Sequence, residues 1–239
     1  MSPRDERRRQ AAPPAVTTSS APSGRRLSHW AWTLIVLGAA AWGWRVLYLG
    51  RLAASPLGGS LTEDAAIYWR WSGVLLAHGL IGRNAFFLGP LYPYALTLLR
   101  VLAGDSIHDV LVLQSLWGAV AVMLLADAAR RLTRPWAGVA VGALALFYET
   151  AVFFDGLVLM ESLLFFLESL LLWCVVRFAV DRASSRMLAL LGALIGLIAE
   201  GRATAVALLL PAWLFLVAPR ALPPARSRSG PHGCSPGSC

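Results

Sequence analysis

The stretch LVLMESLLFFLESLLLWCVVRFAV, residues 157–180, decides the fold. A helix needs roughly 20 mainly apolar residues to cross the hydrocarbon core of a bilayer, and this stretch supplies them. Further apolar runs occupy residues 30–50, 108–132, 135–148, 187–199 and 204–218. The sequence therefore predicts an all-α fold, a polytopic transmembrane helix bundle with six spans.

The composition agrees with a membrane protein. Of the 239 residues, 57% are hydrophobic and only 14% are charged, whereas soluble domains carry about a quarter charged residues. The net charge of +8 comes from 21 basic residues, all arginine, which gather at the ends of the apolar runs. No single basic face is formed, so no nucleic acid is expected as a partner. The three cysteines have no disulfide or metal spacing, and we expect neither metal nor cofactor.

The chain divides into three parts. Residues 1–27 are polar and rich in Arg, Pro and Ser, which predicts a disordered cytoplasmic leader. Residues 28–218 form the transmembrane domain, whose first run is too long for a cleaved signal and is interpreted as an anchor. Arg45, near the end of that run, is expected to reach the membrane interface. Residues 219–239 are low-complexity and predict a disordered tail, interpreted as a truncated or frame-shifted end.

The first loop, from Arg51 to about Ile107, differs from the spans because glycine, proline and charges interrupt it. Residues 64–78 predict a surface helix with an apolar face. The segment FFLGPLYPYALTLLRVLAG, residues 86–104, predicts a loop that runs into a second short helix. Helices of this length suit the membrane interface better than a full crossing.

The arginine bias sets the orientation. Cytoplasmic loops carry an excess of arginine, and six arginines precede the first run, which predicts a cytoplasmic N-terminus in a multi-pass protein of the cell membrane. The arginines expected inside are Arg130, Arg131, Arg134, Arg177, Arg182, Arg186, Arg220, Arg226 and Arg228. The charged residues expected outside are Glu63, Asp64, Glu149, Asp155, Glu200 and Arg202, with Glu161 just within the membrane.

Each of the outer acids has a structural and a functional interpretation. Glu63 and Asp64 follow Thr62, so a helix cap with acids balancing the helix dipole would explain them. Glu161 begins an apolar helix, where a carboxylate costs about 2.5–3.5 kcal/mol at the bilayer centre, and this favours a function. Glu200 and Arg202 are interpreted as a loop ion pair, with phosphate binding by Arg202 as the alternative. Glu168 is expected to pair with a neighbouring helix.

Asp64 is the better candidate for a catalytic base. On a helix that starts near Thr62, Asp64 shares one face with Tyr68, Trp71 and Leu75, which predicts partial burial beside aromatic rings. Glu63 points about 100° away, towards water. No Gly-rich nucleotide loop or Ser–His–Asp order is present, so a donor used at the outer face has to arrive in the lipid.

Several segments together resemble a known family. They are EDAAIYWRWSGVLLAHG at 63–79, FFLGPLYPYALTLLRVLAGDS at 86–106, VLVLQSLWGAVAVMLLADAARRL at 110–132, GALALFYETAVFFDGLVLMESLLFFL at 142–167 and GALIGLIAEGRATAVALLLPAW at 192–213. Their order and spacing are similar to the N-terminal half of the GT-C membrane glycosyltransferases. The nearest branch resembles bacterial relatives of protein O-mannosyltransferases and of the lipid A sugar transferases.

The resemblance implies a glycosyltransferase, a hexosyltransferase that moves a sugar from a polyprenyl-phosphate carrier to a lipid, glycan or protein acceptor on the outer membrane face. It implies two catalytic acids, Asp64 as the base and Glu161 as the second acid. The residues expected to bind substrate are Glu63, Tyr68, Arg83, Tyr92 and Arg202, with Arg202 facing the lipid phosphate. A carboxylate that takes the acceptor proton and a cation for the departing phosphate form a coherent pair.

Two features depart from the family pattern. Gly89 stands where a basic residue often precedes the proline of the PLYP segment at 90–93, and Arg83 is the nearest cation. The family also runs to about twice this length. The alternative interpretation is a non-catalytic protein that binds or transports a polyprenyl lipid, and the third is a non-functional remnant. Asp64 separates them, since only catalysis needs its carboxylate.

Overall fold

A computed structural model of the chain describes residues 28–55, 60–61, 63–79, 88–181, 185–202, 204, 207 and 210. Every regular element among these residues is a helix, which confirms the all-α fold class. The helices are α2 (His29–Ala53), α3 (Glu63–His78), α4 (Leu91–Ala103), α5 (Ile107–Leu132), α6 (Pro135–Leu146), α7 (Glu149–Asp155), α8 (Glu161–Asp181) and α9 (Ser185–Gly201). The expected leader, tail and last span lie outside the described residues.

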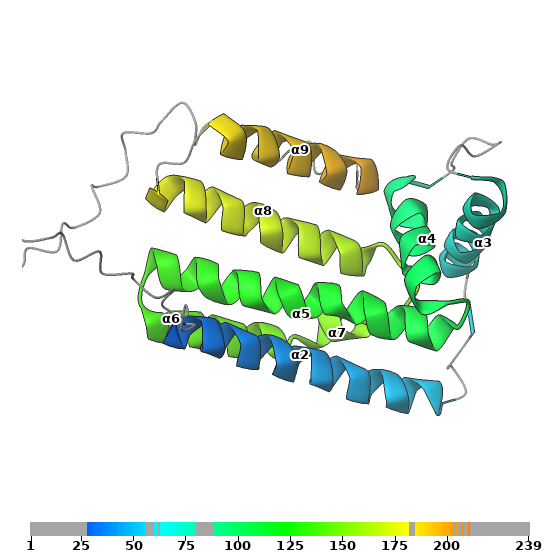
Figure 1. The fold of residues 1–239 in the computed structure, drawn as a ribbon, viewed down its shortest axis with the longest axis horizontal. Coiled ribbons are helices and arrows are strands. Elements are labelled where there is room, and N and C mark those ends of the chain that lie inside the picture. Colours follow the sequence, from blue (N-terminus) through cyan, green and yellow to red (C-terminus); the bar gives the residue numbers. More distant parts are fainter. Residues whose placement is uncertain are drawn as a thin grey trace, which may run out of the picture.

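The long helices form a bundle, and the two short helices of the first loop lie together at one end of it (Figure 1). Helices α2, α5, α8 and α9 run side by side, and α6 with α7 packs along α2 and α5. Helices α3 and α4 pack against each other beside the start of α5. The two helices expected at the membrane interface are therefore present, and we call their end of the bundle the α3 end.

Fewer helices than expected have the length and composition of a membrane span. Among the described residues these are α2, α5 and α8, with a fourth if α6 and α7 are one span bent by 52°. Helix α9 has 17 residues, about 26 Å of rise, slightly less than the hydrocarbon thickness of about 30 Å. Glu149 begins α7 directly after the bend and is exposed. Its expected place on the outer side stays a prediction.

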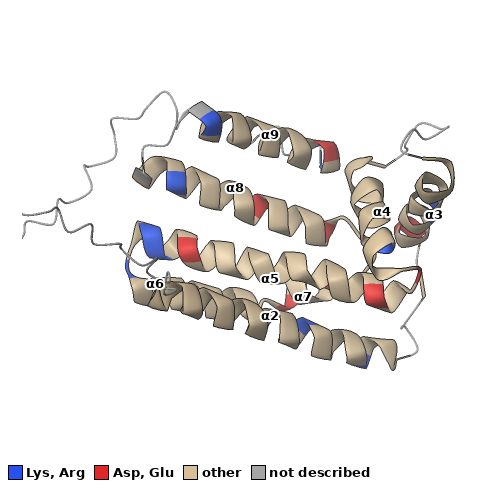
Figure 2. Ribbon diagram, viewed as in Figure 1, with Lys and Arg blue, Asp and Glu red and all other residues tan. Residues whose placement is uncertain are grey.

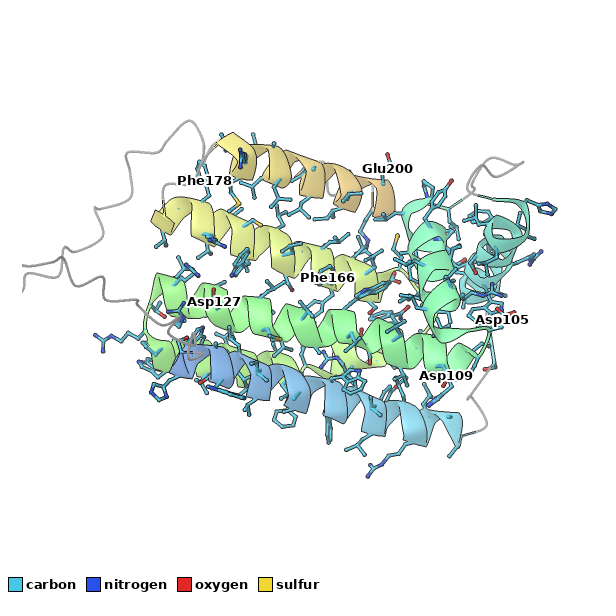
Figure 3. The ribbon with its side chains drawn as sticks, in the orientation of Figure 1. Asp105, Asp109, Asp127, Phe166, Phe178 and Glu200 are labelled. Carbon is cyan, nitrogen blue, oxygen red and sulfur yellow. The ribbon has the colours of Figure 1, made fainter. Side chains whose placement is uncertain are left out.

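Charged residues are distributed unevenly between the two ends of the bundle (Figure 2). The end opposite the α3 end carries the arginines of the last turn of α5 and of the start of α9, and Asp127 lies near it (Figure 3). The α3 end carries Asp105, Asp109 and Glu200, also labelled in Figure 3. The α3 end also carries Arg51, Arg70, Arg100 and Arg202, so acids are concentrated at this end while arginines lie at both ends.

Asp127 joins three helices near the arginine-rich end. Its carboxylate accepts hydrogen bonds from the indole N–H groups of Trp30 on α2 at 2.8 Å and Trp173 on α8 at 2.9 Å. Arg130 and Arg131 of its own helix contact the same carboxylate at 2.8 and 2.6 Å. A carboxylate inside an apolar bundle is tolerated only when paired, and these four donors provide the pairing.

Arg45 does not reach the membrane interface, contrary to the expectation. It is fully buried in the bundle, and its Nε donates to Asp155 Oδ2 at 2.6 Å. Asp155 is buried as well, instead of lying outside, and its other oxygen accepts from the hydroxyl of Ser162. Gly118 of α5 faces this pair so closely that any Cβ there would collide with both side chains. In a medium of low dielectric, pairing is cheaper than leaving either charge unpaired at this depth.

A second arginine fastens α3 to α4. Arg100 Nη1 donates to the carbonyl of Trp69 at 2.9 Å and to the hydroxyl of Ser72 at 2.7 Å. Its guanidinium lies 4.1 Å from the centre of the Trp69 ring, and Asp105 neutralises it from the other side. Arg100 therefore holds the helix that carries Glu63 and Asp64 on the helix that carries Tyr92.

The predicted orientation can be tested by labelling. With Cys234 and Cys239 replaced by serine, Ser60→Cys should react with an impermeant thiol reagent from outside the cell. Thr133→Cys should react only after permeabilisation, because it follows the arginines of α5. Both positions are exposed, so access is decided by the membrane alone. The reverse labelling pattern would exclude the orientation.

The buried ion pair makes a prediction about stability. Asp155→Leu should lower the free energy of unfolding by about 3–5 kcal/mol, because it leaves the buried Arg45 charge unpaired. Arg45→Leu combined with Asp155→Leu should recover most of that loss, since a buried pair and an apolar pair differ little in stability. Unfolding in detergent with increasing denaturant gives both values. The control is Arg51→Leu at the exposed end of α2, and equal losses in the single and double variants would contradict the pairing.

Candidate functional site

Two tyrosines form the centre of the candidate site at the α3 end. Tyr68 of α3 meets Tyr92 of α4 edge to face, with ring centroids 4.9 Å apart. The Tyr92 hydroxyl donates to Gln114 Oε1 at 2.7 Å, and Gln114 Nε2 donates to the carbonyl of Leu157 at 2.9 Å. Tyr92 and Gln114 are fully buried. A buried polar chain thus leads from the first-loop helices to the connection that precedes α8.

The charges of both expected catalytic acids contribute to the pKa of the same tyrosine, Tyr68. The pKa of Tyr68 is raised above its ordinary value by burial first, and then by the negative charges of Glu161 and Asp64. The pKa of Tyr92 is raised well above its ordinary value by burial, by Tyr68 and by Glu161. Asp64 of α3 and Glu161 of α8 are far apart in the sequence, yet the charges of both influence the pKa of this phenol. Both phenols keep their protons at neutral pH, and the Tyr92 hydroxyl donates its proton to Gln114.

The expected partial burial of Asp64 is wrong. Asp64 and Glu63 are both exposed, although Tyr68 and Leu75 on the Asp64 face are buried as predicted. The reason is position: Asp64 is the second residue of α3, so its side chain extends past the end of the packed face. Exposure leaves this carboxylate accessible from water. Thr62, the expected cap, lies outside the described residues, as does Arg83.

Arg202 pairs with Glu161 and not with Glu200, which corrects the expected loop ion pair. Arg202 Nη2 lies 3.6 Å from Glu161 Oε1, and the two side chains are 56% and 32% exposed. The pair is therefore partly open to solvent and is weaker than a buried ion pair.

Two glycines allow Arg202 to reach this position. A Cβ at Gly89 would collide with the carbonyl oxygen of Glu200, so the backbone before α4 touches the end of α9. A Cβ at Gly201 would lie 2.9 Å from a methyl of Leu164 and 3.0 Å from the sulfur of Met160. The contact at Gly89 also explains why no basic side chain occupies that position here.

A hollow of about 230 Å³ lies beside the Glu161–Arg202 pair, between α7 and α8. Tyr148, Thr150 and Phe154 form the α7 side, and Glu161 and Glu168 contribute carboxylates from the α8 side. Glu168 is exposed and not paired with a helix among the described residues. Among all residues that the structure describes, no three His, Cys, Asp or Glu side chains gather as metal ligands.

Sequence reasoning missed the buried polar residues that support the site. Gln114, Asp155 and Ser162 hold the start of α8, and Arg45 was assigned to the interface. The sequence did indicate that Arg45 and Gln114 need polar partners, since each lies inside an apolar run. The sequence pattern does not identify those partners.

The fold and the site define a polytopic helical membrane protein in which Asp64, Glu161 and Arg202 lie at the α3 end. The family model of dolichyl-phosphate-mannose-protein mannosyltransferase matches residues 88–233, and the chain belongs to this family of GT-C membrane glycosyltransferases. The match includes Tyr92, Glu161 and Arg202 and begins after Asp64. No curated protein and no solved structure matches the chain.

The convergence on Tyr68 makes a prediction that needs no substrate. Asp64→Asn and Glu161→Gln should each lower the pKa of Tyr68, because removing a nearby negative charge makes the phenolate less unfavourable. Glu63→Gln should leave the pKa unchanged. The difference in tyrosinate absorbance between each variant and the same variant with Tyr68→Phe isolates this titration. An unchanged Tyr68 pKa in Asp64→Asn would mean that Asp64 faces away from the site.

Proposed function

We propose that the protein transfers a sugar, mannose by its family, from a polyprenyl-phosphate carrier to an acceptor hydroxyl on the outer face of the cell membrane, with its N-terminus in the cytoplasm. The observation that carries the proposal is the pair of Glu161 and Arg202 at 3.6 Å, near enough to α3 that the charges of both Glu161 and Asp64 raise the pKa of Tyr68. Membership in a glycosyltransferase family supports the reaction class. The acceptor is a lipid, a glycan or a protein.

In this reaction Asp64 is the base. Its carboxylate takes the proton from the acceptor hydroxyl as the hydroxyl oxygen attacks the anomeric carbon of the sugar. The bond from that carbon to the phosphate oxygen breaks, and its electron pair leaves with the lipid phosphate. A single displacement inverts the configuration at the anomeric carbon. The exposure of Asp64 supports this role, because an acceptor that arrives from the aqueous side can reach it.

Arg202 stabilises the leaving group. Its guanidinium is more than half exposed and can accept a second anion beside Glu161. A planar guanidinium matches phosphate geometry, and a positive charge is most valuable where negative charge develops in the transition state. Glu161, as the second acid, holds this guanidinium at the mouth of the hollow between α7 and α8.

The remaining expected substrate-binding residues surround these three. Tyr68, whose pKa responds to both acids, is proposed as a phenolic donor, and its ring packs edge to face on the ring of Tyr92. Glu63 is exposed next to Asp64 and is proposed to contact the acceptor. Arg83 is proposed as a further cation for the phosphate.

The test compares two neighbouring acids. Asp64→Asn should abolish transfer from polyprenyl-phosphate mannose in proteoliposomes, while Glu63→Gln should reduce it only mildly. General base catalysis supplies typically about 10²–10⁴-fold, so the difference between the variants is large. If Asp64 only balanced the helix dipole, its loss would cost about 0.3–1 kcal/mol of helix stability and no activity. Near-normal transfer by both variants would overturn the catalytic assignment.

A second measurement separates the enzyme from its alternative. Saturable binding of polyprenyl-phosphate mannose without transfer, unchanged by Asp64→Asn, would support a non-catalytic lipid-binding or transport protein. Whether the protein is an enzyme or a binding protein, weaker binding of polyprenyl-phosphate mannose by Arg202→Gln would support phosphate recognition by Arg202.

A further inference from the structure

The connection from α7 to α8 ends at Glu161, and three buried polar contacts hold it. Asp155, the last residue of α7, accepts from the hydroxyl of Ser162, the second residue of α8. Arg45 of α2 donates to the other oxygen of Asp155 at 2.6 Å. Gln114 of α5 donates to the carbonyl of Leu157 in the middle of the connection. Side chains of α2 and α5 therefore hold the connection, and the hydrogen bond from Ser162 to Asp155 joins its two ends.

The four polar side chains that hold this connection are buried where apolar side chains could fill the same space. Arg45, Gln114, Asp155 and Ser162 are each at most 1% exposed, in a bundle whose other contacts are mainly apolar. Buried polar groups of this kind cost stability relative to apolar residues of the same shape, but they specify one geometry. The geometry in question is the first turn of α8, because Ser162 is the residue directly after Glu161.

We propose that Ser162 and Asp155, supported by Arg45 and Gln114, are positioning residues that set the contact between Glu161 and Arg202. All four are at most 1% exposed, so each is proposed to act through its neighbours and not by contact with substrate. Asp155 fixes the direction of the first turn of α8 through the Ser162 hydroxyl, and this turn directs the Glu161 carboxylate towards the end of α9. The importance of that contact for catalysis rests on the proposed transfer reaction, while the contact itself can be measured without it.

The chain contains no lysine, which allows a direct measurement of this contact. Arg202→Lys introduces a single lysine at the place of the guanidinium, which lies 3.6 Å from the Glu161 carboxylate. A water-soluble carbodiimide joins a carboxylate and an amine in contact, with loss of water, and mass spectrometry identifies the joined peptides. The introduced amine can react with Glu161 across the helices or with Glu200 nearby in the chain. The ratio of the two products reports the position of Glu161 with its own internal reference.

Ser162→Ala in the Arg202→Lys background should lower the ratio of the Glu161 product to the Glu200 product. A fall of about threefold or more is expected, the factor that one typical buried hydrogen bond gives to a local equilibrium. Ser169→Ala is the matched control: Ser169 is also a buried serine of α8, but its hydroxyl bonds to the carbonyl of Phe165 in its own helix. Its ratio should equal that of the parent. Equal ratios in the Ser162→Ala and Ser169→Ala variants would overturn the proposal.

Two further measurements make the outcome unambiguous. Ser162→Cys, close in volume with a much weaker donor, should lower the ratio as Ser162→Ala does, and it replaces that variant if the alanine variant fails to insert. With Arg202 intact, Ser162→Ala should reduce kcat about tenfold with little change in KM for the lipid donor, while Ser169→Ala changes neither. If Ser162→Ala lowers the ratio of the Glu161 product to the Glu200 product but the unmodified protein shows no sugar transfer, the positioning role is supported and the proposed reaction is rejected. An unchanged kcat with a lowered ratio would reject the importance of the contact for catalysis.

Discussion

The ion pair between Arg45 and Asp155 is the constraint on which the rest of the bundle depends. A charge at this depth has no water to solvate it, so each partner fixes where the other must lie. The pair joins the first span to the end of α7, and Gly118 of α5 leaves the space that it occupies. Three helices, α2, α5 and α7, are thereby held in one register. The start of α8 follows from that register, because Asp155 also binds Ser162.

The opposite requirement governs the α3 end, where the site has to remain accessible. Helices α3 and α4 are too short to cross a membrane, and Arg100 fastens them to each other through a carbonyl, a hydroxyl and an aromatic ring. The close approach at Gly89 then brings the end of α9 against the start of α4. The acids and Arg202 consequently lie at the surface of a rigid frame. Partly exposed polar groups on rigid helices are a suitable arrangement for binding a charged lipid headgroup.

Some of this could be predicted from the sequence and some could not. Run length and composition predicted the helical bundle and the two short helices of the first loop, because both depend on local chemistry alone. The helical start at Glu161 was predicted for the same reason. The partner of Arg202 was not, because a pattern cannot distinguish Glu200 nearby from Glu161 across the bundle. Asp64 shares a face with Tyr68 as expected, but periodicity carries no information on how far the packed face extends. The catalytic roles stay predictions.

The bend between α6 and α7 has a consequence for the surrounding lipid. The helical hydrogen bonds of α6 end at Phe147 and Tyr148, whose N–H groups bond to the carbonyls of Ala143 and Ala145. Irregular backbone cannot face hydrocarbon, and the exposed carboxylates of Glu149 and Glu168 lie close to the same break. Headgroups and water have to approach this flank of the bundle. The bilayer should therefore be locally thinned and deformed beside Tyr148.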